Sequence, residues 1–399
     1  MKRLAPGALI ALLMLAEKAW RHWMIARFFR KRPPQPTTPV RLVSILQPIL
    51  SGDPTMPACL QSNLTMQTAY EVEYIWLIDT NDPEAARICQ NQVERYPQKR
   101  IRLHAMPPPG ERDNPKMVKL IRGLELAEGE VVCVLDDDTV LPHAGLDTCV
   151  PYLDRPGVGL AFGLPYYTNF SNLWSSLVSY FVNSHSLLTY IPYTALTQPF
   201  TINGMFYCAR RGTLAAVGGF RGIEQTLADD FAVAQRFKQY GLTLAQTPLL
   251  HGISTQVTGP RHYLSLIQRW FIFPRESLMR HLNPRDQAIL YGTGLLPALY
   301  PLLLIAWALI KPSKAKSTYT LTYFAYSLAL FAHINKHYLH SAAPTKTAWL
   351  VPLIQIFFPL QLLAALLSPK RIIWRGHVMQ VEKGGGFRFV QRREGVSKT

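Results

Sequence analysis

The feature that most constrains this chain is a pair of long apolar segments in its C-terminal third. Residues 287–310 and residues 347–368 contain no Asp, Glu, Lys or Arg. Each segment reaches the roughly 20 residues that a helix needs to cross a bilayer. Buried helices of soluble proteins are rarely this long and this free of charge. We therefore expect a transmembrane region over residues 287–368, in which residues 318–332, rich in Tyr and Thr, are a weaker third candidate.

The N-terminal residues 1–32 combine a short apolar run with a basic flank. The run over residues 4–16 is too short for a comfortable span, and six Lys and Arg residues follow it between Lys18 and Arg32. A signal peptide is one alternative, but such a flank resists export and stays in the cytoplasm. We expect a membrane anchor or an interfacial helix over residues 1–32, followed by a stiff Pro-rich linker over residues 33–39.

Charge and cysteine content narrow the range of partners. The formal net charge is +17 and the pI about 9.7, which fits nucleic acid, an anionic membrane surface or an anionic nucleotide substrate. Because no helix-turn-helix, zinc finger or RRM-type motif occurs, we expect no nucleic-acid partner. The 5 cysteines form no C-x-x-C pair, which argues against disulfides and zinc and favours buried thiols in a reducing compartment.

Residues 40–286 alternate between strand-like and helical segments. This alternation is typical of an α/β domain with a Rossmann-like, mostly parallel sheet. The predicted strands cover residues 42–47, 74–79, 100–106 and 131–136, and the predicted helices cover residues 56–67, 82–96 and 117–127. In such sheets functional groups lie at the carboxyl ends of the strands, which is where Asp79 and Asp136 occur.

Three consecutive carboxylates, Asp136, Asp137 and Asp138, follow the fourth predicted strand. Their mutual repulsion would be offset by a divalent cation, and carboxylates are suitable ligands for Mg²⁺ or Mn²⁺. In an extended stretch Asp136 and Asp138 point to one side and Asp137 to the other, so we predict Asp136 and Asp138 as the metal ligands. An acidic turn that caps the next helix is the alternative interpretation.

Two further motifs carry polar chemistry. Asp229 and Asp230 open an amphipathic helix within residues 226–241, where acids are ordinary partners of the helix dipole. A carboxylate at such a position also suits a general base that deprotonates a hydroxyl. Arg269 and Trp270 precede the apolar region; the guanidinium could bind a diphosphate through two hydrogen bonds and the indole could support an acceptor.

Taken in order along the chain, these motifs resemble the membrane-bound inverting glycosyltransferases of family 2, and most closely the ceramide glucosyltransferase branch, family 21. The resemblance covers nearly the whole chain. It includes the segments VSILQPILSGDP at residues 43–54, IDTNDPEAARICQNQVERYP at 78–97, NPKMVKL at 114–120, GLAFGLPYY at 159–167, NGMFYCARR at 203–211 and IIWRGHVMQV at 372–381.

The resemblance implies a GT-A domain over residues 40–286 that binds a UDP-sugar. It implies the following roles: Asp79 contacts the base, Asp136 and Asp138 bind the metal and the diphosphate-ribose, Lys116 lies near the diphosphate, Asp230 is the catalytic base, and Arg269 and Trp270 close the site over the donor. One departure is Leu266, which holds a position where the family has Gln or Arg; whether Gln268 substitutes is left open.

Residues 165–200 are rich in aromatic residues and carry no Lys, Arg, Asp or Glu. They are predicted to form a surface or gate for a lipid acceptor, and a buried helical insertion is the alternative. The lone histidines His185 and His251 are interpreted as structural residues with satisfied hydrogen bonds. The group His333, His337 and His340 is interpreted as interfacial.

The expected activity is transfer of glucose or N-acetylglucosamine from a UDP-sugar to a hydroxyl of a ceramide-like or hopanoid lipid, by metal-assisted single displacement. We further expect an integral protein of the bacterial inner membrane with the catalytic domain facing the cytoplasm. The positive charge of the basic tail, residues 369–399, favours the cytoplasm as well, but its side depends on whether residues 318–332 span the membrane. A processive polysaccharide synthase is one alternative, although it would normally need more spanning helices and the missing Gln. A catalytically inactive lipid-binding protein on the same fold is the other.

Overall fold

The computed structural model describes residues 6–341 and 343–393, and the chain forms two compact units that are both discontinuous in sequence. The α/β unit contains residues 33–165, 198–281 and the described part of 368–399. The helical unit contains the described parts of residues 1–32, 166–197 and 282–367. The basic tail therefore belongs to the α/β unit, although the whole apolar region separates the two in sequence.

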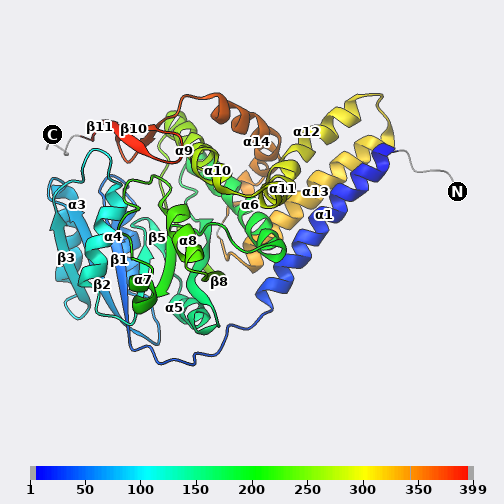
Figure 1. Ribbon diagram of the computed structural model, residues 1–399. Coiled ribbons are helices and arrows are strands. Elements are labelled where there is room, and N and C mark those ends of the chain that lie inside the picture. The colour runs from blue at the N-terminus through cyan, green and yellow to red at the C-terminus, as the bar shows by residue number, and fades with distance from the viewer. Residues whose placement is uncertain (1–5, 342, 394–399) are drawn as a thin grey trace. The chain divides into compact units, whose positions relative to one another are not determined.

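The α/β unit contains an eight-stranded sheet and a three-stranded sheet (Figure 1). Its strands are β1 (Leu42–Pro48), β2 (Glu71–Asp79), β3 (Arg100–Met106), β4 (Val131–Leu135), β5 (Thr139–Val140), β6 (Val158–Tyr167), β7 (Phe206–Arg210), β8 (Thr243–Ile253), β9 (Arg371–Trp374), β10 (His377–Val381) and β11 (Phe387–Gln391). Its helices are α2 (Met56–Leu64), α3 (Pro83–Arg95), α4 (Pro115–Leu126), α5 (Gly145–Cys149), η1 (Val150–Asp154), α7 (Arg211–Ala216), α8 (Asp229–Gln239), α9 (Pro260–Phe273), η2 (Pro274–Leu278) and α10 (Met279–His281).

The large sheet has the strand order β3-β2-β1-β4-β7-β6-β8-β5. Strands β3, β2, β1 and β4 are parallel to one another, whereas β7 pairs antiparallel with both β4 and β6. The parallel half confirms the predicted α/β fold and the four predicted strands. Because parallel strands end at the same edge, the loops after β1, β2 and β4 are brought together there.

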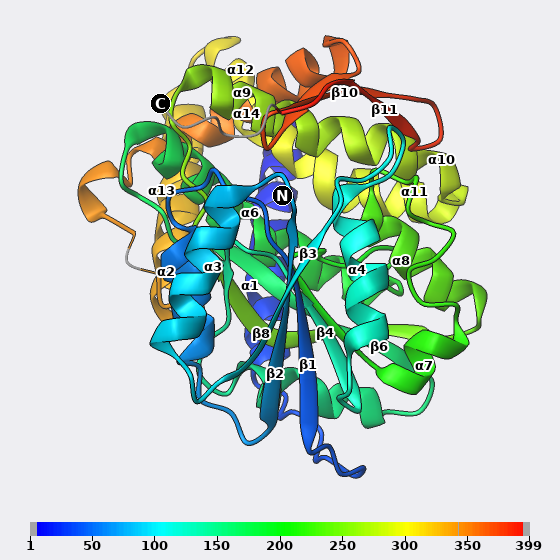
Figure 2. The ribbon, with the colours of Figure 1, turned by 90° about the vertical axis from the view of Figure 1, so that its left-hand side faces the viewer.

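Helices cover both faces of this sheet (Figure 2). One face of β1 and β2 buries Ile45 and Trp76 in a core with α2 and α3, and the other buries Leu46 and Leu77 in a core with α4 and α8. The alternation arises because successive side chains of a strand point to opposite faces. Strands that are apolar on both faces need both faces covered, which is typical of parallel sheets between two layers of helices.

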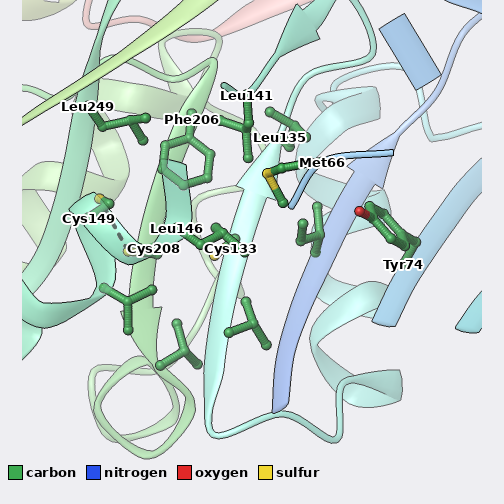
Figure 3. Packing of buried hydrophobic residues seen from close by; sticks show 14 of the residues in the cluster. Met66, Tyr74, Cys133, Leu135, Leu141, Leu146, Cys149, Phe206, Cys208 and Leu249 are labelled. Atoms are coloured by element: carbon green, nitrogen blue, oxygen red, sulfur yellow. Dashed lines mark hydrogen bonds between the residues drawn. The ribbon is translucent and has the colours of Figure 1, made fainter. Parts of the chain in front are cut away.

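Buried thiols form part of the first of these cores. Figure 3 shows Cys133, Cys149 and Cys208 among Leu135, Leu146 and Phe206, and the sulfur atoms of Cys149 and Cys208 lie 3.6 Å apart. All five cysteines are free and buried, which confirms their interpretation as small core residues.

The helical unit contains α1 (Pro6–Phe29), α6 (Leu173–Leu196), α11 (Pro284–Leu290), η3 (Tyr291–Leu295), α12 (Leu296–Leu309), α13 (Lys314–His337), η4 (Thr345–Thr347) and α14 (Leu350–Leu367). Within the described residues, two helices are long and apolar enough to cross a membrane: Pro284–Leu309 and Leu350–Leu367. Only 28% and 39% of their most apolar windows are buried, so much of the apolar surface of both is uncovered within the protein itself. The weaker candidate, residues 318–332, lies in α13.

Candidate active site

Three loops meet where the parallel strands end. Asp79 is the last residue of β2 and Asp136 directly follows β4. The backbone N–H of Leu50, just after β1, donates to Oδ2 of Asp137 at 2.9 Å. The next residue along, Ser51, donates through its backbone N–H to Oδ2 of Asp82 at 2.8 Å. The ends of the strands thus carry a group of carboxylates, Asp79, Asp82 and Asp136 to Asp138, which we call the ring of carboxylates. Backbone amides of the loop after β1 donate to two of them, Asp137 and Asp82.

Asp136, Asp137 and Asp138 form a turn, in which the N–H of Thr139 donates to the carbonyl of Asp136 at 3.2 Å. The premise that these acids lie in an extended stretch is therefore wrong, because the chain reverses at once to enter β5. Each acid has its own partners, and Asp137 is a structural residue, 4% exposed and bonded on both oxygens. The Thr255 hydroxyl donates to Oδ2 of Asp138 at 2.8 Å.

Lys116 joins the two acidic motifs. Its Nζ lies 2.7 Å from Oδ1 of Asp136 and 3.3 Å from Oδ2 of Asp229, and it donates to the carbonyl of Gly204 at 2.8 Å. The lysine stands in the first turn of α4, which begins where the Asn114 side chain accepts the N–H of Lys116. Residues more than 110 positions apart in sequence, Lys116 and Asp229, are therefore neighbours in the fold.

Burial shifts the protonation of this cluster. It raises the pKa of Asp136 to about 6, against the opposing effect of Lys116 and with the help of Asp138. Burial, reinforced by neighbouring Asp229, also raises the pKa of Asp230 well above the usual range of an aspartate. Burial alone would lower the pKa of Lys116, but Asp136 and Asp229 together raise it, so the lysine stays charged. The cluster thus holds one charged lysine beside two acids, Asp136 and Asp230, whose pKa values are raised.

The remaining predicted residues lie outside this cluster. Asp79 forms an ion pair with Lys119 at 3.0 Å, and Lys119 also donates to the carbonyl of Ile49 at 2.9 Å. Arg269 and Trp270 lie half-buried near the end of α9. Burial and then the charge of Arg269 lower the pKa of His262.

The Leu266 position has a clear structural role. Leu266 is a core residue, 5% exposed. The side-chain amide of Gln268 donates to the carbonyl of Pro369 at 2.9 Å, so it fixes α9 to the segment that leads into β9. Gln268 is therefore engaged with the C-terminal segment.

One candidate residue, Arg375, was not identified from the sequence. Arg375 directly follows β9, in the turn before β10, and its Nη2 lies 2.5 Å from Oδ1 of Asp137 and 3.5 Å from Oδ2 of Asp138. Its only sequence signal was the Trp-Arg pair at residues 374–375. The interpretation of His251 as a structural histidine with satisfied hydrogen bonds is wrong, because the ring is buried and neither ring nitrogen has a hydrogen-bond partner among the described residues. His185, by contrast, has Nδ1 2.8 Å from the carbonyl of Phe181, as predicted.

A pocket lies beside this ring of carboxylates. Its walls include Leu50, Asp79 and Asn81 from the loops after β1 and β2, and His377, Phe389 and Arg392 from the C-terminal sheet. Both sets of residues belong to the α/β unit. An open pocket with a carboxylate at a strand end is the usual place for a nucleotide in a sheet of this kind.

The sequence profile of Glycosyl transferase family 21 matches residues 5–387. The chain belongs to this family. The predicted resemblance is thereby confirmed, and the family 21 protein is a glycosyltransferase. Among solved structures it is similar to a mannosyltransferase from Pyrobaculum calidifontis in complex with GDP-Man and Mn²⁺, at 17% identity and a TM-score of 0.48, over 88% of this chain and 99% of that one.

Proposed function

We propose that this family 21 protein is an inverting glycosyltransferase that moves a sugar from a UDP-sugar to a hydroxyl of a membrane lipid. The observation that carries the proposal is the convergence of Asp136, Lys116, Asp229 and Asp230, from three distant segments, at the carboxyl ends of the strands. Lys116, a partly buried cation among Asp136, Asp229 and Asp230, is suited to a substrate that brings its own negative charge and a second cation.

Asp230 is the proposed catalytic base. An acid whose pKa lies well above its usual range accepts a proton more readily than an ordinary aspartate, which is what a base near neutral pH requires. The acceptor oxygen bonds to the anomeric carbon as its proton passes to Asp230, and the bond from that carbon to the diphosphate breaks. One displacement inverts the configuration and forms no covalent intermediate with the protein.

The carboxylate set fits a divalent cation. Five acids, Asp136, Asp137, Asp138, Asp229 and Asp230, surround two cations, Lys116 and Arg375, so the cluster carries excess negative charge. Within the described ranges no three His, Cys, Asp or Glu side chains are arranged to hold a metal ion by themselves. This agrees with Mg²⁺ or Mn²⁺ chemistry, in which waters and substrate phosphates complete the shell. Asp136 and Asp138 would hold the ion, which when bound would neutralise the charge of the leaving diphosphate.

Asp79 is the proposed contact to the nucleotide base and Lys116 the proposed contact near the diphosphate; Arg269 and Trp270 are proposed to close the site. A lipid acceptor is supported by the composition of residues 165–200, most of which form α6 and carry no charged residue. The two apolar helices support a membrane location. Ceramide-like and hopanoid lipids are the candidate acceptors and glucose and N-acetylglucosamine the candidate sugars, at the cytoplasmic side of a bacterial inner membrane.

Substitution Asp230→Asn tests the base. An amide cannot take up the acceptor proton, so we expect turnover of UDP-sugar to fall about 10³-fold while UDP affinity stays within about twofold. The measurement is transfer of radiolabelled sugar to extracted lipid by the full chain in vesicles, with UDP binding followed by calorimetry.

Asp147→Asn is the matched control, because Asp147 also stands in a first helical turn but bonds to Thr68 and Ala69 away from the cluster. Its turnover should equal that of the unsubstituted protein. Near-full turnover by Asp230→Asn with donor still bound would remove Asp230 from the role of base.

A further inference from the structure

The C-terminal sheet begins with a hairpin whose tip has an unusual residue. Trp374 of β9 pairs with His377 of β10, so Arg375 and Gly376 form a two-residue turn. Both have positive φ, 48° and 86°. This is the backbone of a type I′ turn, whose first position favours Asn, Asp or Gly. An arginine in left-handed conformation is strained, and such strain persists mainly where the side chain has a task.

The guanidinium of Arg375 reaches the ring of carboxylates. Besides Asp137 at 2.5 Å and Asp138 at 3.5 Å, it donates from Nη1 to the carbonyl of Leu50 at 3.4 Å. The side chain of Arg375, in the C-terminal segment, therefore links the loop after β1 to the acidic turn after β4. Asp138 is also a proposed metal ligand, so Arg375 lies where a diphosphate and its cation would be held.

A second arginine fixes the same sheet to the same loop. Arg393 donates to the carbonyl of Ser51 and, at 2.8 Å, to its hydroxyl oxygen. The Ser51 hydroxyl in turn donates to Oδ1 of Asp82 at 2.6 Å. Gly52 has φ 117°, and a Cβ there would stand 3.3 Å from Nη1 of Arg393, so this loop passes close to the side chain of Arg393, just after β11.

The sheet also supplies one wall of the pocket that contains Asp79. The rings of His377 and Phe389 lie edge to face with centroids 5.2 Å apart, and the guanidinium of Arg392 lies 4.9 Å from the centroid of Phe389. Arg392 further donates to the carbonyl of Pro109, another residue of the pocket wall, at 2.8 Å. Aromatic faces bind bases by stacking, and guanidinium groups bind phosphates, so this wall has the chemistry of a nucleotide site.

We propose that the C-terminal sheet, β9 to β11, is part of the donor site: it walls the nucleotide pocket, and Arg375 binds the diphosphate of a nucleoside diphosphate substrate next to the acidic turn. The proposal rests on the proposed function. It assigns to residues beyond the apolar region a direct part in donor recognition, and it explains why a strained arginine stands at the hairpin tip.

Nucleoside diphosphate affinity tests the proposal without any need for acceptor or turnover. UDP and GDP are titrated into the detergent-solubilised full chain, with Mn²⁺ present, for the unsubstituted protein and for Arg375→Asn and Arg375→Lys. Asparagine suits the type I′ turn, so the hairpin persists while the guanidinium is lost. We expect a Kd about 30-fold higher for Arg375→Asn and a smaller rise for Arg375→Lys, which keeps the charge.

Arg388→Asn is the matched control, because Arg388 is an exposed residue of β11 in the same sheet. Its Kd should stay within twofold. In parallel, hydrogen exchange of the unsubstituted protein is compared with and without UDP, and we expect UDP to slow exchange over residues 375–393. This second measurement does not depend on how well any variant folds.

The outcomes separate the two proposals. Unchanged affinity in both Arg375 variants, or exchange in residues 375–393 unaffected by a UDP that binds, overturns the inference and leaves the proposed transferase intact. If the unsubstituted protein binds GDP but not UDP, and the Arg375 variants bind GDP more weakly, the result supports a part of the C-terminal sheet in the donor site. It then contradicts only the choice of UDP as the nucleotide. A protein that binds neither nucleotide overturns both.

Discussion

Lys116 is the side chain on which the two acidic motifs depend. Lys116→Met would leave the carboxylates of Asp136 and Asp229 facing one another without their shared cation. Breaking a partly buried ion pair in this way is expected to lower the free energy of unfolding by about 3 kcal/mol at pH 7.5.

The decrease in the free energy of unfolding caused by Lys116→Met should depend on pH. Without the ammonium, the folded-state pKa of Asp136, already raised to about 6, rises further above its unfolded value. A raised pKa of a carboxyl group lowers the stability of the folded state only where the group is ionised. The stability lost in Lys116→Met should therefore become smaller as the pH falls from 7.5 to 5.5. Thermal unfolding of both proteins at the two pH values measures this. An equal deficit at both pH values would mean that Lys116 stabilises by packing alone.

Buried His251 lowers the free energy of unfolding, and a substitution should remove this effect. Its ring is fully buried beside Gly163, where a Cβ would stand 2.6 Å from Nδ1, and both nitrogens are desolvated without partners among the described side chains. His251→Phe should therefore raise the free energy of unfolding by roughly 1 kcal/mol at pH 7.

The gain from His251→Phe should grow in acid. Burial lowers the pKa of His251 to about 3 in the folded state, whereas the unfolded ring titrates near ~6.5. Below about pH 6.5 the unfolded chain takes up a proton that the folded protein excludes, which lowers stability by up to about 1.4 kcal/mol per pH unit. Chemical unfolding at pH 7 and 5.5 should show the gap between the two proteins widening. A constant gap would mean that the native ring is hydrated or hydrogen-bonded.

At the scale of elements, strong local patterns were predictable and long-range pairings were not. β1 to β4 have apolar runs bounded by turn residues, and the four predicted strands agree with their bounds to within a few residues. β9, β10 and β11 are only four or five residues long. They pair with one another within a C-terminal tail whose sequence is basic and rich in Gly. Their position depends on contacts with Leu50, Ser51 and the acidic turn, which no local pattern specifies.

The C-terminal sheet is also held by a buried carboxylate in η2. Glu276 is 1% exposed and lies 2.8 Å from Nζ of Lys370, 3.2 Å from Nη2 of Arg280 and 3.4 Å from Nε of Arg275. Because these cations are partly solvated, Glu276→Gln should cost about 2 kcal/mol locally.

Limited proteolysis reports on the Glu276 contact. Cleavage within residues 369–393 should become several-fold faster in Glu276→Gln, because local opening exposes this segment more often. Glu382→Gln, just after β10, is the control and should be cleaved at the unsubstituted rate. An unchanged rate for Glu276→Gln would show that Arg375, Arg393 and the strand pairing hold the sheet without this carboxylate.

At the scale of the whole molecule, the sequence places the candidate residues on their elements, but it does not show how these residues are arranged relative to one another. The acids were identifiable because they stand at strand ends and a helix start. Their grouping around Lys116 required knowledge of which loops meet. The part of Arg375 required a contact between residues 137 and 375, and the unsatisfied state of His251 required side-chain geometry. Pattern reasoning places residues on elements, whereas packing decides which of them touch.

The central claim is that this family 21 protein joins a sugar to a lipid hydroxyl with Asp230 as base. Mass spectrometry of lipids extracted from vesicles after incubation with UDP-sugar and the full chain tests it most directly. We predict a lipid species heavier by one sugar residue with the unsubstituted protein and with Asp147→Asn, and almost none with Asp230→Asn. A water-soluble polymer, no product at all, or equal glycolipid from Asp230→Asn would contradict the claim.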